Sequence, residues 1–277
     1  FLTFLYLAVC EDLWISMLMD YHIHTRASPD AMGNMEEYAK KAKERNISEI
    51  GFSDHIILHH NNGYPHMPLQ HMQIYVENFL DFKEKSEVPV KLGVELDFVP
   101  GDVDKIREFI QKYPFDYVIG AVHFIGDWGV DSRRQINEYF KRDVVQIYEE
   151  YFGLVTELCK CQLFDILAHP DLIKIFGFRP NSDFSRILME TAEAMAKSNI
   201  CAEINTAGLR RPCSEIYPSA QFLKILRGYN VPIVFGSDAH EPSDVGKDFE
   251  EAVRLAEKAG YTRACVFNHR EREFVNL

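Results

Sequence analysis

Histidine and carboxylate side chains recur at the ends of short apolar segments along this 277-residue chain. The first such segment, in the stretch DYHIHTRASPD, contains His22 and His24. Side chains two residues apart on a strand point to the same face, so both imidazoles can enter one metal site. Two histidines alone are equally compatible with an exposed strand face. Only the rest of the chain can distinguish the two interpretations.

The same residue types follow five later segments of strand-like composition. These motifs are GFSDH with Asp54 and His55, GVELDF with Glu95, GAVHF with His123, LAHPD with His169 and Asp171, and GSDAH with Asp238 and His240. Each has an ordinary structural interpretation, such as a turn cap at His169 or a hydrogen bond between Asp238 and His240. Together they would crowd like charges and desolvated groups, which shifts pKa values and lowers stability. A cluster of divalent cations resolves that conflict.

Strand-like and helix-like segments alternate from Asp20 onward, a pattern typical of a parallel sheet wrapped by helices. Strands are predicted over residues 20–24, 49–53, 90–97, 116–123, 164–168, 201–205 and 232–237, with a last candidate over 263–267. Helices are predicted over residues 35–46, 70–86, 102–113, 135–160, 184–199, 219–230 and 248–260. Seven strand–helix units favour an α/β barrel over a flat doubly wound sheet, and a barrel has its active site at the carboxyl ends of the strands.

Length and composition indicate one domain without a membrane span. The apolar content of 47% can fill a single core of barrel size. A net charge of −12 argues against a nucleic-acid partner. The six cysteines include no C-x-x-C pair and are expected to be reduced thiols of a cytoplasmic protein. The sequence does not indicate an oligomeric state.

The first 18 residues are apolar but too short to span a membrane, and they lack a basic segment typical of a signal peptide. We therefore expect residues 1–18 to be an extension outside the core and residues 19–277 to form the domain.

The ordered motifs together resemble the PHP (polymerase and histidinol phosphatase) superfamily, and most closely its monofunctional histidinol-phosphate phosphatases. They are H-x-H, D-H, G-x-E, V-H, H-P and G-S-D-A-H, in this order between residue 19 and about residue 270. The resemblance implies a distorted (β/α)7 TIM-like barrel with three divalent metals, which are zinc, iron or manganese.

The resemblance also implies a ligand set. The first metal takes His22, His24, Glu95 and Asp238. The second takes Glu95 as a bridging ligand together with His123 and His169. The third takes Asp30, His55 and His240.

The activity implied is hydrolysis of L-histidinol phosphate to L-histidinol and phosphate in histidine biosynthesis, by a metal-bridging hydroxide. Three dications outweigh three carboxylates and one hydroxide, so the site attracts a dianionic phosphoryl group. Glu95, Asp238 and His240 are the expected catalytic residues, since the last two can also carry a proton. The alternatives are a superfamily phosphoesterase acting on nucleotides or phosphotyrosine, and a non-catalytic metal-binding interaction module.

Arginines on the same side of the predicted strands are candidates for binding the phosphate, because a guanidinium can pair with two phosphate oxygens. They are Arg26 after the first strand, Arg179 after the fifth, and Arg210 and Arg211 after the sixth. The loop over residues 57–71 is either a lid over the substrate or a solvated loop.

Overall fold

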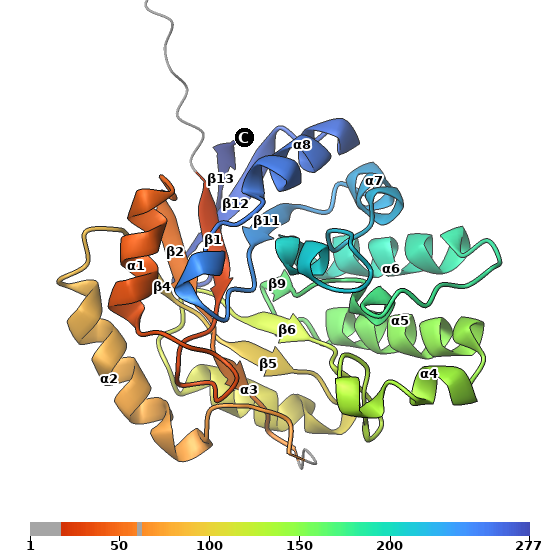
Figure 1. The fold of residues 1–277 in the computed structure, drawn as a ribbon, viewed down its shortest axis with the longest axis horizontal. Helices are drawn as coiled ribbons and strands as arrows, with labels where there is room; N and C mark the ends of the chain where they lie inside the picture. Colours follow the sequence, from red (N-terminus) through yellow and green to blue (C-terminus); the bar gives the residue numbers. More distant parts are fainter. Residues whose placement is uncertain (1–17, 60–62) are drawn as a thin grey trace, which may run out of the picture.

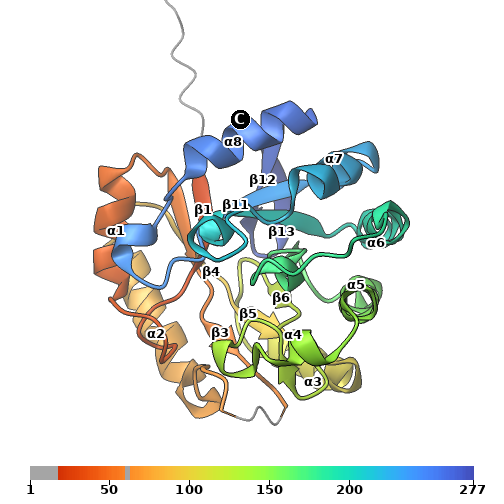
Figure 2. The ribbon, with the colours of Figure 1, turned by 45° about the vertical axis from the view of Figure 1, so that its right-hand side comes forward.

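The computed structural model describes residues 18–59 and 63–277, and it arranges them as parallel strands surrounded by helices (Figures 1 and 2). The strands of the barrel are β1 (Met19–Ile23), β2 (Glu49–Phe52), β3 (His55–Ile56), β4 (Val90–Leu92), β5 (Glu95–Asp97), β6 (Ile119–Ala121), β9 (Ile166–Leu167), β10 (Cys201–Asn205) and β11 (Ile233–Gly236). The helices are α1 (Met35–Glu44), α2 (Met72–Lys83), α3 (Val103–Gln111), α4 (Glu138–Lys141), α5 (Val144–Cys161), α6 (Ser185–Ser198), α7 (Ala220–Gly228) and α8 (Phe249–Ala259). Residues 1–17 of the predicted extension lie outside the described residues.

Two parallel sheets continue into each other and close the barrel. One has the strand order β1-β2-β4 and the other β11-β10-β9-β6-β5-β3. The chain runs from β2 into β3 and from β4 into β5, which joins the sheets along one side. On the other side, the His24 amide donates to the Ala239 carbonyl at 2.9 Å and the Ala239 amide donates to the His22 carbonyl at 3.1 Å. The predicted distorted (β/α)7 barrel is confirmed.

The distortion lies where two predicted strands are interrupted. The strand predicted over 90–97 is wrong as a single element, because Gly93 and Val94 separate β4 from β5. The strand predicted over 49–53 ends at Phe52, and β3 begins only at His55. These breaks shift the hydrogen bonding from one sheet to the other, and β3 and β5 then lie side by side with His55 opposite Glu95.

The last predicted strand and the longest predicted helix also differ from the structure. β12 (Arg263–Asn268) pairs antiparallel with β13 (Glu271–Asn276), so it forms a hairpin outside the barrel. The hairpin lies against the amino-terminal end of the barrel, where the Arg270 amide donates to the Asp116 carbonyl at 2.8 Å. The helix predicted over 135–160 is divided into α4 and α5, because the Asp143 carboxylate caps α5 by accepting from the Val145 and Gln146 amides.

The helices bury the apolar faces that the sequence predicts. In α3, the buried residues Ile106, Phe109 and Ile110 follow the spacing of three and four that places side chains on one face. α1 begins with a capping box, in which the side chains of Asn34 and Glu37 each accept a backbone amide of the other residue. No helix among the described residues is long and apolar enough to cross a membrane.

The barrel interior holds a tyrosine that requires glycines around it. Tyr117 is fully buried and donates from its hydroxyl to the Tyr21 carbonyl at 2.7 Å. A Cβ atom at Gly93 would lie 2.2 Å from the Tyr117 ring, and one at Gly51 would lie 2.1 Å from its hydroxyl. Both distances are too short for a side chain at either position without a shift of the tyrosine.

We therefore expect Gly93→Ala to lower the free energy of unfolding by about 1–3 kcal/mol, the usual cost of overpacking a core. Gly153→Ala is the matched control, because Gly153 is exposed in α5 and a Cβ there meets no atom within 4 Å. It should raise the free energy of unfolding by about 0.5–1 kcal/mol through helix propensity. Urea denaturation measures both, and equal stability of the two variants would contradict this packing.

Candidate metal centre

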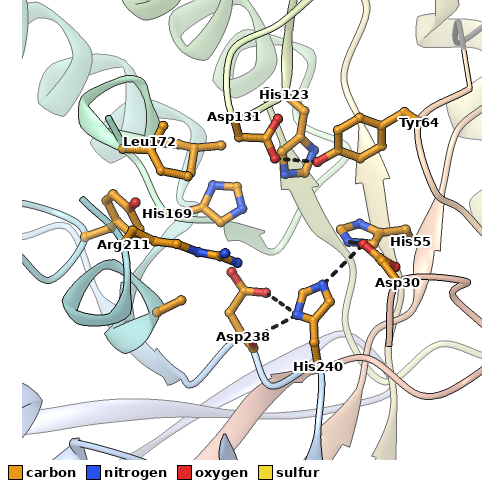
Figure 3. A pocket seen from close by; sticks show the side chains of 13 residues that line it. Asp30, His55, Tyr64, His123, Asp131, His169, Leu172, Arg211, Asp238 and His240 are labelled. Atoms are coloured by element: carbon orange, nitrogen blue, oxygen red, sulfur yellow. Dashed lines mark hydrogen bonds and ion pairs between the residues drawn. The ribbon is translucent and has the colours of Figure 1, made fainter. Parts of the chain in front are cut away.

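The carboxyl ends of the barrel strands bring the predicted ligands to one place, and Figure 3 shows Asp30, His55, His123, His169, Asp238 and His240 around one cavity. His22 lies in β1, His55 in β3 and Glu95 in β5, and each is buried. The other members follow the ends of their strands within a few residues. They are His24 after β1, His123 after β6, His169 after β9, and Asp238 and His240 after β11.

Glu95 lies at the centre of this cluster, with its side chain 1% exposed. Five histidines surround its two carboxylate oxygens at 2.7–3.7 Å. The closest nitrogens are Nδ1 of His55 at 2.7 Å, Nε2 of His169 at 3.2 Å, Nε2 of His22 at 3.3 Å, Nε2 of His24 at 3.6 Å and Nε2 of His123 at 3.7 Å.

Asp238 and Asp30 extend the cluster toward the opening of the barrel. Oδ1 of Asp238 lies 3.3 Å from Nε2 of His24 and 3.5 Å from Nδ1 of His240. Oδ2 of Asp30 lies 3.5 Å from Nε2 of His240 and 3.9 Å from Nε2 of His55. All nine residues of the predicted ligand set are thus neighbours, and their roles as ligands stay a prediction.

Three groups in this cluster have the geometry to hold a metal ion, because their ligand atoms lie within 4.8 Å of one another. These groups are His22, His24 and Asp238; Glu95, His123 and His169; and His24, His55 and His240. Nε2 of His22 and both Glu95 oxygens are buried without a hydrogen-bond partner among the described residues. Buried donors and acceptors that converge without bonding each other indicate divalent metal ions between them. The side chains present therefore fit the metal cluster.

The electrostatics of the site keep its two central carboxylates ionised, as metal ligation needs, and in turn these carboxylates raise the pKa of His22 and His55. Burial alone would raise the pKa of Glu95, but the surrounding histidines, His55 first, hold that pKa well below its usual range. Asp238 behaves in the same way, with His22 the strongest of the groups that lower its pKa. Burial, aided by His55 and His240, lowers the pKa of His24, so its imidazole is neutral.

Two further carboxylates orient the histidines, and the ligand prediction did not include them. Oε1 of Glu203 lies 2.6 Å from Nδ1 of His22, and Oδ1 of Asp97 lies 2.9 Å from Nδ1 of His123. Each leaves Nε2 of its histidine facing Glu95, an arrangement that fixes the tautomer of a metal ligand. The sequence signal was present, since both are acidic residues within apolar strands.

Glu203 also holds the backbone at a strained position. His169 has a φ of 25° and its amide donates to Oε2 of Glu203 at 2.7 Å. Asn205 donates to Oε2 of Glu203 at 3.0 Å and to Asp238, whose φ is 53°. A Cβ at Gly236 would lie 1.9 Å from Oε1 of Glu203, so the close approach requires glycine there. Non-glycine residues with such φ values cluster at functional sites.

Asp54 and Asp171, the remaining acidic residues of the motifs, have structural contacts. Asp54 accepts hydrogen bonds from the amide and hydroxyl of Thr25 and from the hydroxyl of Ser28 at 2.8–2.9 Å. These bonds fix the loop that carries Asp30. Asp171 pairs with buried Lys174 at 2.9 Å and accepts the Ser219 amide at 2.8 Å.

The cluster opens into a cavity of about 80 Å³, named the metal cavity below and shown in Figure 3. Its lining consists of Asp30, His55, Tyr64, His123, Asp131, His169, Leu172, Ile175, Ala207, Arg211, Tyr217, Asp238 and His240. Tyr64 belongs to the loop predicted as a lid or solvated segment. Residues 60–62 of that loop lie outside the described residues, and the lid stays a prediction.

Of the four candidate arginines, Arg211 lines the metal cavity. Arg179 instead pairs with Glu215 at 2.6 Å. Arg210 donates to the Ser237 carbonyl at 2.7 Å and lies 3.4 Å from Asp244, so it ties the loop after β10 to the loop after β11. Arg26 lines a separate surface pocket beside α1 and α2. Arg211 is thus the one of the four that lines the metal cavity, and its role in binding phosphate stays a prediction.

The barrel and its cluster of histidines and carboxylates define a class of protein, the metal-dependent hydrolases with a TIM-like barrel. The chain belongs to the PHP domain family, whose pattern matches residues 20–207. It is 33% identical over 258 residues to the "probable histidinol-phosphatase" of Deinococcus radiodurans, which covers 92% of this chain and 98% of that protein. It is 24% identical to the histidinol-phosphatase of Bacillus subtilis, over 83% of this chain and 96% of that protein.

Among solved structures, the fold is similar to that of histidinol phosphate phosphatase from Lactococcus lactis. The TM-score is 0.78 at 23% identity, over 93% of this chain and 99% of that one. That protein was crystallised with zinc, L-histidinol and phosphate. The family assignment and the shared barrel confirm the resemblance seen in the ordered motifs.

The central position of Glu95 leads to a prediction about metal content. We expect Glu95→Gln to lower the binding affinity for two metal ions at once, each by at least about tenfold, because the amide carries no charge to bridge them. Metal titration followed by elemental analysis measures this. Glu49→Gln is the control, since Glu49 bonds the Tyr21 hydroxyl away from the cluster. Loss of a single ion, or unchanged affinity, would contradict the bridging role.

Proposed function

We propose that this chain hydrolyses L-histidinol phosphate to L-histidinol and inorganic phosphate, a step of histidine biosynthesis. The proposal is carried by the 33% identity to a protein named as a probable histidinol-phosphatase, 98% of whose length is covered. This chain also brings the predicted ligands together in one cluster. A non-catalytic module would be expected to have lost ligands, and all nine predicted ligand positions carry a histidine or a carboxylate.

The metal cavity suits a phosphate monoester. Divalent ions bound by the cluster would polarise the phosphoryl oxygens and activate water at neutral pH. Arg211 adds a guanidinium that can pair with phosphoryl oxygens. The residues lining the metal cavity include no serine, threonine or cysteine, which favours direct attack by water over a covalent enzyme intermediate.

Asp238 and His240 are our candidates for moving a proton to the leaving alcohol. Oδ1 of Asp238 and Nδ1 of His240 lie 3.5 Å apart, and both side chains line the metal cavity. Proton transfer by a positioned side chain contributes roughly 10²–10⁴ in rate. Glu95 acts by holding the metals rather than by contact with the cavity, because it is buried beneath its histidines.

We also propose that the reaction takes place in the cytoplasm and without a nucleic-acid partner. The described cysteines, Cys159, Cys161, Cys201, Cys213 and Cys265, are all free thiols. Free thiols suit a reducing compartment. The net charge of −12 disfavours binding to a polyanion.

Phosphate release from a panel of substrates tests the function. With the metal-loaded protein, we expect kcat/KM for L-histidinol phosphate to exceed that for phosphotyrosine and for a nucleoside bisphosphate by at least about tenfold, because the leaving group is recognised as well as the phosphate. Glu95→Gln serves as the inactive control. Equal or greater turnover of phosphotyrosine or the nucleotide would overturn the substrate assignment and leave the metal centre unaffected.

A further inference from the structure

A second cavity adjoins the metal cavity. This outer pocket has a volume of about 480 Å³ and is lined by Asp30, Gly63, Tyr64, Pro65, Phe124, Asp127, Asp131, Ser132, Arg133, Arg134 and Gln135. The two cavities share three lining residues, namely Asp30, Tyr64 and Asp131. A substrate with its phosphoryl group at the metal cluster therefore has room for its leaving group along Tyr64 and Asp131.

Asp131 presents a carboxylate that is not paired with a lysine or arginine among the described residues. The Tyr64 hydroxyl donates to its Oδ2 at 2.6 Å, and its Oδ1 has no hydrogen-bond partner among the described residues. Within residues 18–59 and 63–277, no lysine or arginine forms an ion pair with it. A carboxylate on a cavity wall that lacks a cationic partner favours a ligand that supplies one.

The shared wall is also aromatic. The Tyr64 ring lies 5.1 Å from the Phe124 ring and 5.4 Å from the His123 ring, measured between centroids. Aromatic faces attract ammonium and imidazolium groups. A carboxylate beside such a ring therefore forms a site for a cationic or ring-bearing leaving group.

The metal cavity has a positively charged side chain at one place and a negatively charged one at another. Arg211 and Asp131 lie on either side of His169 in the view of Figure 3, with Tyr64 beside Asp131. A molecule with a dianionic phosphoryl group at one end and a cation at the other matches this arrangement in one orientation only. Its phosphoryl group faces Arg211 and the metal ligands, and its cation faces Asp131.

We propose that Asp131, oriented by Tyr64, determines substrate specificity by binding the cationic leaving group of an amino-alcohol phosphate. This inference rests on the proposed function, because L-histidinol carries an amine and an imidazole. It adds a residue that selects the alcohol, beyond the cluster that binds the phosphoryl group. Phosphate esters of uncharged alcohols cannot make this contact.

The test compares substrates and product inhibitors in the metal-loaded Asp131→Asn variant. We expect the ratio of kcat/KM for L-histidinol phosphate to that for β-glycerol phosphate, the ester of an uncharged alcohol, to fall about 10-fold to 100-fold, the range for losing a hydrogen bond to a charged group. Inhibition by L-histidinol should weaken by a similar factor, whereas inhibition by inorganic phosphate should not.

Two further variants separate this role from a general effect. Tyr64→Phe removes the hydroxyl that holds the carboxylate, and the same ratio should fall by a smaller factor. Asp127→Asn removes a negative charge that lines the outer pocket but not the metal cavity, and the ratio should stay unchanged. An equal fall with Asp127→Asn would mean that diffuse charge, rather than Asp131, selects the substrate, and would overturn the proposal.

The remaining outcomes are equally decisive. A loss of bound metal in Asp131→Asn would make Asp131 part of the metal centre and would contradict a role in specificity. An unchanged substrate ratio and unchanged inhibition by L-histidinol would also overturn the inference. If the wild-type protein does not hydrolyse L-histidinol phosphate, the proposed function itself fails, a result distinct from any of these.

Discussion

The architecture of this protein depends on one buried carboxylate among histidines. Glu95 lies within 2.7–3.7 Å of five imidazoles, and its oxygens make no hydrogen bond to any described residue. A charge in such a place is destabilising unless cations compensate it. The metal ions that fit between these side chains provide that compensation, so the same ions that enable the chemistry also stabilise the end of the barrel.

The barrel is built to place this carboxylate and its partners. The interruption between β2 and β3, and that between β4 and β5, allow His55 and Glu95 to pair across adjacent short strands. Below them, Tyr117 fills the interior between Gly51 and Gly93. Around them, Glu203 and Asp97 fix the imidazoles of His22 and His123. The distortion that separates this fold from a regular barrel is therefore tied to the site.

The sequence allowed the order of the strands and the ligand positions to be predicted, because ligand-type residues at successive strand ends must converge when parallel strands close into a barrel. It did not reveal the strand breaks, since Gly93 and Val94 continue an apolar run. β13 was missed because its residues are largely polar and half exposed. The partners of Arg179 and Arg210 depend on contacts with Glu215 and Asp244, which lie more than thirty positions away in the chain and carry no local signal.

The most direct test of the central role of Glu95 is anomalous X-ray diffraction from crystals of the protein purified without chelator, recorded at the absorption edges of zinc, iron and manganese. We expect three anomalous peaks within the cluster, two of them in contact with Glu95. The third peak is expected beside Asp30, His55 and His240. A single peak, or peaks that avoid Glu95, would contradict the account.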